Sequence, residues 1–159
     1  MISGPIAFEE SARTLLVVHA VLGFAAVFTV THHAASALLA ARGRRVRRQL
    51  RRFGWMAPAT LAAQAVFGLA LYPAYRVRVR FADLERTAPV VAELFELKEH
   101  LAALALALVF AAAFGGRSLP AEPAAPRAVA ALSVCGAALV WTAALIGLYV
   151  TARHPVGMS

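Results

Sequence analysis

The sequence is poor in charged residues and in cysteine. Asp, Glu, Lys and Arg together make up 15% of its 159 residues, against about 25% in an ordinary soluble domain. A soluble protein needs a polar surface, and this chain has too few charged residues to make one. Cys135 is the single cysteine, which excludes a disulfide framework. The sequence also lacks a phosphate-binding glycine loop and a serine nucleophile motif, so nothing in it indicates nucleotide or hydrolase chemistry.

Hydrophobic residues are abundant instead, at 61% of the chain. Most of them fall in four long segments, from Thr14 to Ala41, from Phe53 to Tyr75, from Glu93 to Phe114 and from Arg127 to Thr151. Each segment reaches the length of about 20 residues that a helix needs to cross a membrane. In lipid an unpaired backbone group costs several kcal/mol, so these segments must be helical. The sequence therefore predicts an all-α fold, an integral membrane antiparallel four-helix bundle, formed by residues 1–159 as a single domain.

The loops between the predicted spans are rich in arginine. Residues 42–52 contain seven arginines, and Arg117 and Arg127 lie in or beside the loop of residues 115–126. Short loops rich in Lys and Arg remain in the cytoplasm. We therefore expect a multi-pass protein of the inner (cytoplasmic) membrane, with loops 42–52 and 115–126 in the cytoplasm and both termini outside. Anionic lipid is the first partner that the net charge of +8 meets in a bilayer, and we expect no nucleic-acid partner.

Four histidines lie within the predicted spans, where ionisable residues are costly and mark candidate functional sites. His19 and His33 are 14 residues apart in the first span. At 100° and 1.5 Å per residue, they point to within about 40° of each other and lie about 21 Å apart along the helix axis. Gly23 lies on the same face, whereas His32 points about 220° away from His19. The fourth, His100, belongs to the third span.

This arrangement resembles that of the membrane b-type cytochromes, in which histidines on two helices hold one haem iron from both sides. The residues that carry the resemblance are His19, Gly23, His33 and a facing candidate, His100. It implies haem b as cofactor, with His19 and His100 as the two ligands of the haem iron. Both histidines lie about 9–10 Å from the outer boundary of their spans, at 1.5 Å per residue. A second haem at His33 would need a different ligand set or a neighbouring subunit, and stays an open alternative.

Charged residues gather where the third span begins, and two interpretations of them remain open. In the first, Glu96 and Glu99 form salt bridges with the arginines of residues 76–80 and anchor the helix. In the second, these carboxylates accept protons beside a bound quinone, with Tyr72 and Arg76 at the same site. Residues 76–80 alternate Arg and Val, and we expect them to form an extended or interfacial strip.

Three further residues belong to this part of the prediction. Tyr75 is expected at the same outer end of the bundle. Lys98 is expected to extend its amine outward to water, as long basic side chains near span ends do. Gln64 of the second span is expected to donate a hydrogen bond across helices.

The leading hypothesis is a small membrane haem b protein that passes electrons between a quinone pool and an outer redox partner. One alternative is a non-catalytic membrane subunit or assembly factor of a respiratory complex. Another is a proton- or ion-conducting membrane protein. In each case we expect a homo-oligomer or a subunit of a larger membrane complex, and the sequence points to no catalytic residue.

Overall fold

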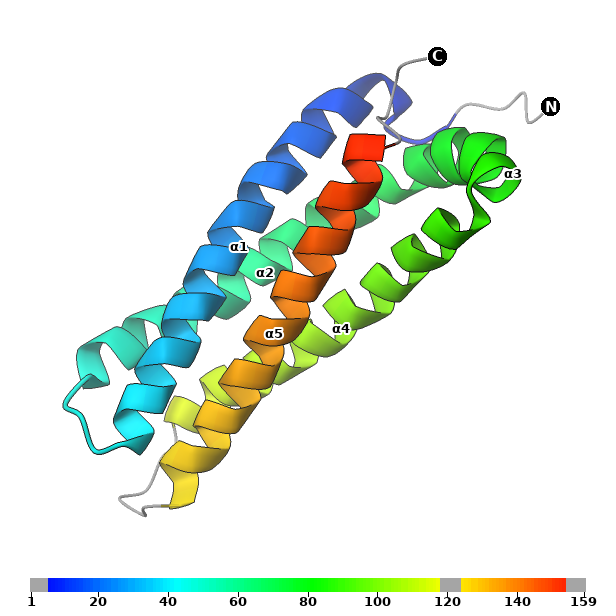
Figure 1. Cartoon of the computed structure of the whole chain (residues 1–159). Helices are drawn as coiled ribbons and strands as arrows, with labels where there is room; N and C mark the ends of the chain where they lie inside the picture. The colour runs from blue at the N-terminus through cyan, green and yellow to red at the C-terminus, as the bar shows by residue number, and fades with distance from the viewer. Residues whose placement is uncertain (1–5, 118–123, 154–159) are drawn as a thin grey trace.

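A computed structural model describes residues 6–117 and 124–153, which form a bundle of four long helices (Figure 1). Helices α1 (Ala12–Ala41) and α2 (Arg47–Tyr75) form one antiparallel pair, and α4 (Pro89–Arg117) and α5 (Ala124–Arg153) form the other. The described residues contain no strand. The prediction of an all-α four-helix bundle is confirmed. Residues 118–123 of the expected loop 115–126 lie outside the described residues, and the remaining ones belong to the ends of α4 and α5.

The four helices are arranged as a ring in which each one packs against two others. Helix α1 packs against α2 and α5, and α4 packs against α5 and α2. Helices α1 and α4 form no extensive contact and therefore lie diagonally opposite each other. A short connection joins α1 to α2, and Gly43 adopts a left-handed conformation in it (φ 77°). Its N–H donates to the carbonyl of Ala40 and so closes the end of α1.

The chain stays helical beyond α2, and the expectation of an extended strip at residues 76–80 is wrong. Residues Arg76–Leu84 form wide π-type turns (η2), and the short helix α3 (Glu85–Thr87) follows. Pro73 lies just before these turns and lacks the N–H that would continue the regular α-helical pattern. Within η2, Val79 and Leu84 are buried. A helical path brings Val79 and Leu84 onto the side of the segment that faces the bundle. It also pairs the backbone N–H and C=O groups, which an extended strip would leave unpaired.

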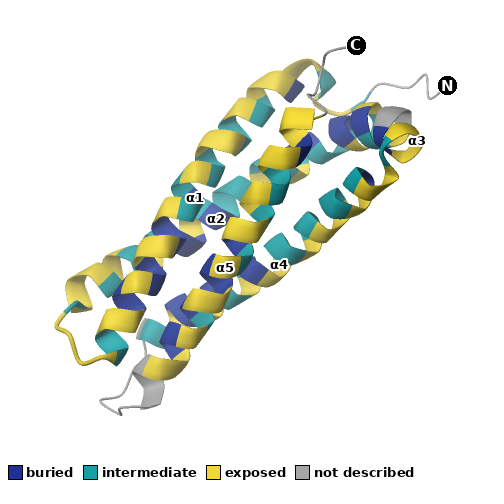
Figure 2. Cartoon of the chain, viewed as in Figure 1, coloured by how far each residue is buried: buried dark blue, intermediate teal, exposed yellow. Residues whose placement is uncertain are grey.

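The outer surfaces of all four helices are apolar, and small residues fill the interior. Figure 2 shows exposed residues along the outward faces and buried residues where the helices meet. The exposed large apolar residues include Phe24, Phe28, Val66, Leu69, Leu97, Leu104, Leu145 and Leu148. The central core consists of Ala26, Val30, Ala34, Ala57, Leu61, Ala105, Val109, Ala137 and Val140. By length and composition, all four helices are capable of crossing a membrane.

The closest approach between α4 and α5 gives a test of this packing. A Cβ on Gly136 would lie 3.0 Å from a methyl group of Val109 and 3.5 Å from its backbone nitrogen. We expect Gly136→Ala to force the helices apart, lower the free energy of unfolding by about 1–3 kcal/mol and lower the melting temperature in detergent.

Gly147→Ala is the matched control, because the nearest atom to its Cβ would be the flexible Lys98 side chain at 3.6 Å. Alanine is the better helix former, so the control should melt at or above the wild-type temperature. Equal melting of the two variants would contradict the α4–α5 packing described here.

Candidate functional site

The inner face of α1 meets α2 in a regular antiparallel register. His19 lies against Gly68, and His33 lies against Gly54. The two glycines are 14 residues apart, as are the two histidines. Each histidine ring is therefore placed where the facing helix has no side chain. The prediction that His19 and His33 share one face of α1 is confirmed by these contacts.

The His19 ring is held by α2 on two sides. Its Nδ1–H donates to the backbone carbonyl of Gln64 at 3.1 Å, and the Gln64 side-chain amide lies 3.4 Å from Nε2. A Cβ on Gly68 would lie only 3.0 Å from the ring carbon Cε1. A Cβ on Gly23 would lie 3.6 Å from the Gln64 side-chain nitrogen. The glycine therefore leaves room for that amide. The expected hydrogen bond of Gln64 across helices is confirmed.

His33 and His32 differ sharply in their surroundings. His33 is 2% exposed, and within the described part of the chain its ring makes no hydrogen bond. His32 is exposed, and its Nδ1–H donates to the carbonyl of Phe28 at 2.8 Å. Its ring also packs against Phe28 and Phe53, with centroid distances of 4.1 and 5.0 Å. His32 thus points away from the His19–His33 face, as its position on the helix predicts.

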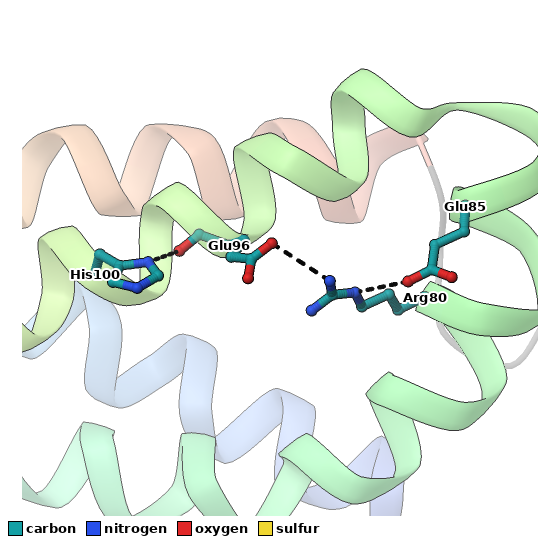
Figure 3. A network of polar contacts seen from close by, with 4 residues as sticks. All are labelled: Arg80, Glu85, Glu96 and His100. Atoms are coloured by element: carbon teal, nitrogen blue, oxygen red, sulfur yellow. Dashed lines mark hydrogen bonds and ion pairs between the residues drawn. The ribbon is translucent and has the colours of Figure 1, made fainter.

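His100 lies on α4, diagonally across the bundle from His19. It is exposed, and its Nδ1–H donates to the carbonyl of Glu96 in its own helix at 2.8 Å (Figure 3). The described residues show no contact between the two rings, so their ligation of one iron stays a prediction. The residue of α4 that interacts electrostatically with His19 is Lys98.

Lys98 does not extend outward as expected. Its Nζ lies 4.0 Å from the centroid of the Phe95 ring, and its aliphatic stem packs near Gly147 of α5. The small residue on α5 makes room for the long side chain between the helices. The amine is thereby held beside the bundle interior rather than in water.

The donor chemistry of His19 and His100 suits a metal ligand. Histidines that bind metals usually donate Nδ1–H to a carbonyl, which leaves the Nε2 lone pair for the metal. Both residues donate Nδ1–H to a carbonyl, and Nε2 of His19 in addition lies 3.4 Å from the Gln64 side-chain amide. No cluster of three or more His, Cys, Asp or Glu occurs among the described residues. A haem iron needs only axial protein ligands, because the porphyrin supplies its other four nitrogens.

Ion pairs tie together the end of the bundle that contains η2. Arg80 donates to Glu85 at 3.1 Å and to Glu96 at 3.3 Å, joining η2 to α3 and α4 (Figure 3). Arg78 donates to Glu9 at 2.6 Å, which joins η2 to the short turn η1 (Glu9–Ser11) before α1. The anchor interpretation is therefore confirmed for Glu96.

The other residues predicted at this end are placed differently. Arg76 is exposed and stacks over Phe81 at 5.4 Å. Tyr72 is half-buried. Glu99 is also half-buried, and it interacts electrostatically with Lys98 and Tyr75.

Tyr75 is the unusual residue of this end. It is 6% exposed and stacks on Phe95 with a centroid distance of 4.0 Å. Its hydroxyl is buried and has no hydrogen-bond partner among the described residues. The sequence predicted the end of the bundle at which Tyr75 lies. It did not predict the burial, which depends on η2 folding back over the ring.

Comparison with known protein families, with curated proteins and with solved structures finds no match to this chain.

The buried hydroxyl of Tyr75 leads to a stability prediction. A buried polar group without a partner costs about 1–3 kcal/mol. Tyr75→Phe removes the hydroxyl and keeps the stacking ring, so we expect the melting temperature in detergent to rise. Tyr72→Phe, at a half-buried position one turn earlier, serves as the control and should change little. A fall in the melting temperature of Tyr75→Phe alone would mean that the hydroxyl has a partner in the purified protein.

The anchoring role of Arg80 leads to a second prediction. Glu96→Gln removes one of its two partly exposed ion pairs, and we expect a loss of about 0.2–1 kcal/mol in the free energy of unfolding. Arg80→Gln removes both pairs and should cost more. Glu93→Gln, one turn before Glu96 and exposed, is the control for the loss of a charge. Thermal melting at low and high salt measures these effects, and equal losses in Glu93→Gln and Glu96→Gln would contradict the anchor.

Proposed function

We propose that the chain is a multi-pass protein of the inner (cytoplasmic) membrane. The support is the apolar outer surface, since soluble monomers rarely expose apolar patches larger than a few hundred Å². In this chain, exposed large apolar residues cover the outward faces of all four helices. The arginine-rich loop 42–52 lies at the same end of the bundle as the C-terminal end of α4 and the start of α5 (Figure 1). The rule for basic loops assigns that end to the cytoplasm and both termini to the outside.

Within that bundle, we propose a haem b site with His19 as an iron ligand. The observation that carries this proposal is the way α2 holds the His19 ring. The carbonyl of Gln64 accepts the Nδ1 proton at 3.1 Å, which fixes the tautomer and leaves the Nε2 lone pair inside the bundle. Gly68 leaves the space that the ring occupies. A ring held in this way loses little conformational freedom on binding a metal.

His100 is the proposed second ligand of the same iron. Its Nδ1 is likewise tied to a carbonyl, so its Nε2 is free to bind. Haem b held by His19 and His100 would supply a one-electron redox centre, which favours electron transfer over oxygen chemistry. The protein's own part is to orient the two imidazoles through their Nδ1–H hydrogen bonds. The Gln64 amide, 3.4 Å from Nε2 of His19, would move away when that nitrogen binds the iron.

His33 is proposed as the ligand of a second haem, which remains an alternative to a single-haem protein. It is buried at a second depth of the same α1 face, and Gly54 is opposite. Among the described residues, no histidine on a neighbouring helix matches its depth. A partner subunit in a homo-oligomer or a larger complex would then supply the other ligand.

The η2 end is the proposed place of exchange with a quinone pool, from which electrons would pass to an outer redox partner. Glu99 and Tyr72 are half-buried there, next to Lys98 and Tyr75. Because Arg80 engages Glu96, Glu99 is the carboxylate that remains for contact with a bound molecule. Arg76 lies exposed at the rim.

A second candidate function is that of a membrane subunit or assembly factor without a cofactor. The observation that favours it is the hydrogen bonding of His19, whose two ring nitrogens already have partners on α2. On this view the histidines serve helix packing alone.

The absorption spectrum of the purified protein separates these two functions. The protein is extracted in mild detergent from membranes of haem-replete cells. We expect it to show the sharp reduced α band of bis-histidine haem. We also expect the pyridine haemochrome assay to give about one haem per chain. His19→Ala and His100→Ala should abolish the low-spin spectrum. His32→Ala is the matched control and should keep it, because that ring packs outside the site.

Folding is checked on the same samples by size-exclusion chromatography and thermal melting. A colourless wild-type protein, or full retention of the spectrum in both His19→Ala and His100→Ala, would contradict the haem proposal. Loss of the spectrum in all three variants together with aggregation would point to a packing role for the histidines.

A further inference from the structure

The net charge of the protein resides at one end of the bundle. At the end that contains residues 42–52, the C-terminal end of α4 and the start of α5, the described residues include nine of the sixteen basic residues and no acidic residue. The opposite end has the other seven basic residues and seven acidic residues. The excess of positive charge among the described residues is therefore located at the first end.

Seven arginines at this end form what we call the arginine collar: Arg42, Arg44, Arg45, Arg47, Arg48, Arg51 and Arg52. All seven are exposed. Within the described residues none of them forms an ion pair, whereas Arg78 and Arg80 at the other end pair with Glu9, Glu85 and Glu96. Among the described residues, the collar thus has no acidic partner, whereas the arginines of the opposite end do.

The position of the collar on α2 shows that helix stability does not explain it. Four of its arginines, in the range 47–52, occupy the first two turns of α2. This is the positive end of the helix dipole, where cations are unfavourable and anions are favourable. Val46 and Leu50 of the same turns are half-buried, and Leu50 packs on the core near Ala37. The arginines therefore point outward, toward whatever surrounds the bundle.

The neighbouring residues place the collar at the depth of lipid headgroups. Trp55 follows one turn later and is 59% exposed. Phe28, His32 and Phe53 form an aromatic group at the same end. Tryptophan is enriched at the boundary between headgroups and hydrocarbon, and the surface beyond Trp55 is apolar.

From this we propose that the arginine collar binds the phosphates of anionic phospholipids, several headgroups at a time. Guanidinium groups donate two parallel hydrogen bonds to phosphate oxygens, and they do so better than lysine amines. Exposed arginines four residues apart, such as Arg47 and Arg51, present neighbouring guanidinium groups on one side of the helix. The bilayer is the favoured source of phosphate because the collar directly adjoins the apolar surface. This inference requires the membrane location but not the haem.

The test measures stabilisation by lipid in the detergent-solubilised protein. Melting temperatures are recorded while short-chain phosphatidylglycerol or phosphatidylcholine is titrated in. We expect a concentration-dependent rise with phosphatidylglycerol and little with phosphatidylcholine. Arg47→Gln combined with Arg51→Gln should weaken the apparent affinity by about tenfold or more. Arg47→Lys combined with Arg51→Lys should retain part of the affinity for phosphatidylglycerol, because lysine keeps the charge but cannot donate the two parallel hydrogen bonds.

Arg76→Gln combined with Arg86→Gln removes two exposed arginines from the opposite end and should leave the response to phosphatidylglycerol unchanged. An equal response of both glutamine pairs, or an equal rise with phosphatidylcholine, would overturn the proposal. Inorganic phosphate giving the same rise would show a free-anion site instead of a lipid site. If a short single-stranded oligonucleotide bound more tightly than the lipid, the proposal of a lipid site would be overturned in favour of a nucleic-acid site. None of these readouts depends on haem, so failure here and failure of the haem proposal are distinguishable.

Discussion

The structure depends on the close approach of α1 and α2 along a face where histidines meet glycines. His19 and His33 are too large for a tight helix crossing unless the facing helix gives up a side chain at the same level. Gly68 and Gly54 do so, and between them a hydrogen bond of 2.7 Å joins Thr29 to Thr60. In lipid, where no hydrophobic force drives helices together, such packing and interhelical hydrogen bonds are the available sources of stability. The glycines therefore position the histidines and hold the helix pair together.

Much of the fold could be predicted because long apolar runs in a membrane leave the backbone no option but a helix. The observed helices extend beyond the predicted spans for reasons that hydropathy does not detect. Helix α2 begins at Arg47 because arginine is a good helix former. Helix α4 begins at Pro89, a residue favoured at the first helical position. The extended conformation expected for residues 76–80 was wrong, because alternating Arg and Val is also compatible with a helix that buries Val79 and Leu84.

The candidate site could be predicted only within single helices. A rotation of 100° per residue was enough to put His19 and His33 on one face and His32 elsewhere. The partners across helices depend on register, which the turn around Gly43 sets and which spacing within α1 cannot reveal. The 14-residue interval between Gly54 and Gly68 was the available signal for that register. At the other end, the burial of Tyr75 follows from the path of η2, and no local pattern indicates it.

The ring of helices has one edge that is less extensively packed than the other three, namely the edge between α2 and α4. The pairs α1–α2 and α4–α5 and the edge between α1 and α5 all make broader contact. The α2–α4 edge consists of direct contacts between the two helices, among them the stacking of Tyr75 on Phe95, and the ion pair from Arg80 of η2 to Glu96 adds to it at one end. The helix pairs α1–α2 and α4–α5 are thus joined firmly along the α1–α5 contact. Along the α2–α4 edge they are joined less extensively, with the ion pair from Arg80 to Glu96 at one end. Separating α2 from α4 would disrupt the least packing, so this side is where the bundle is most compliant.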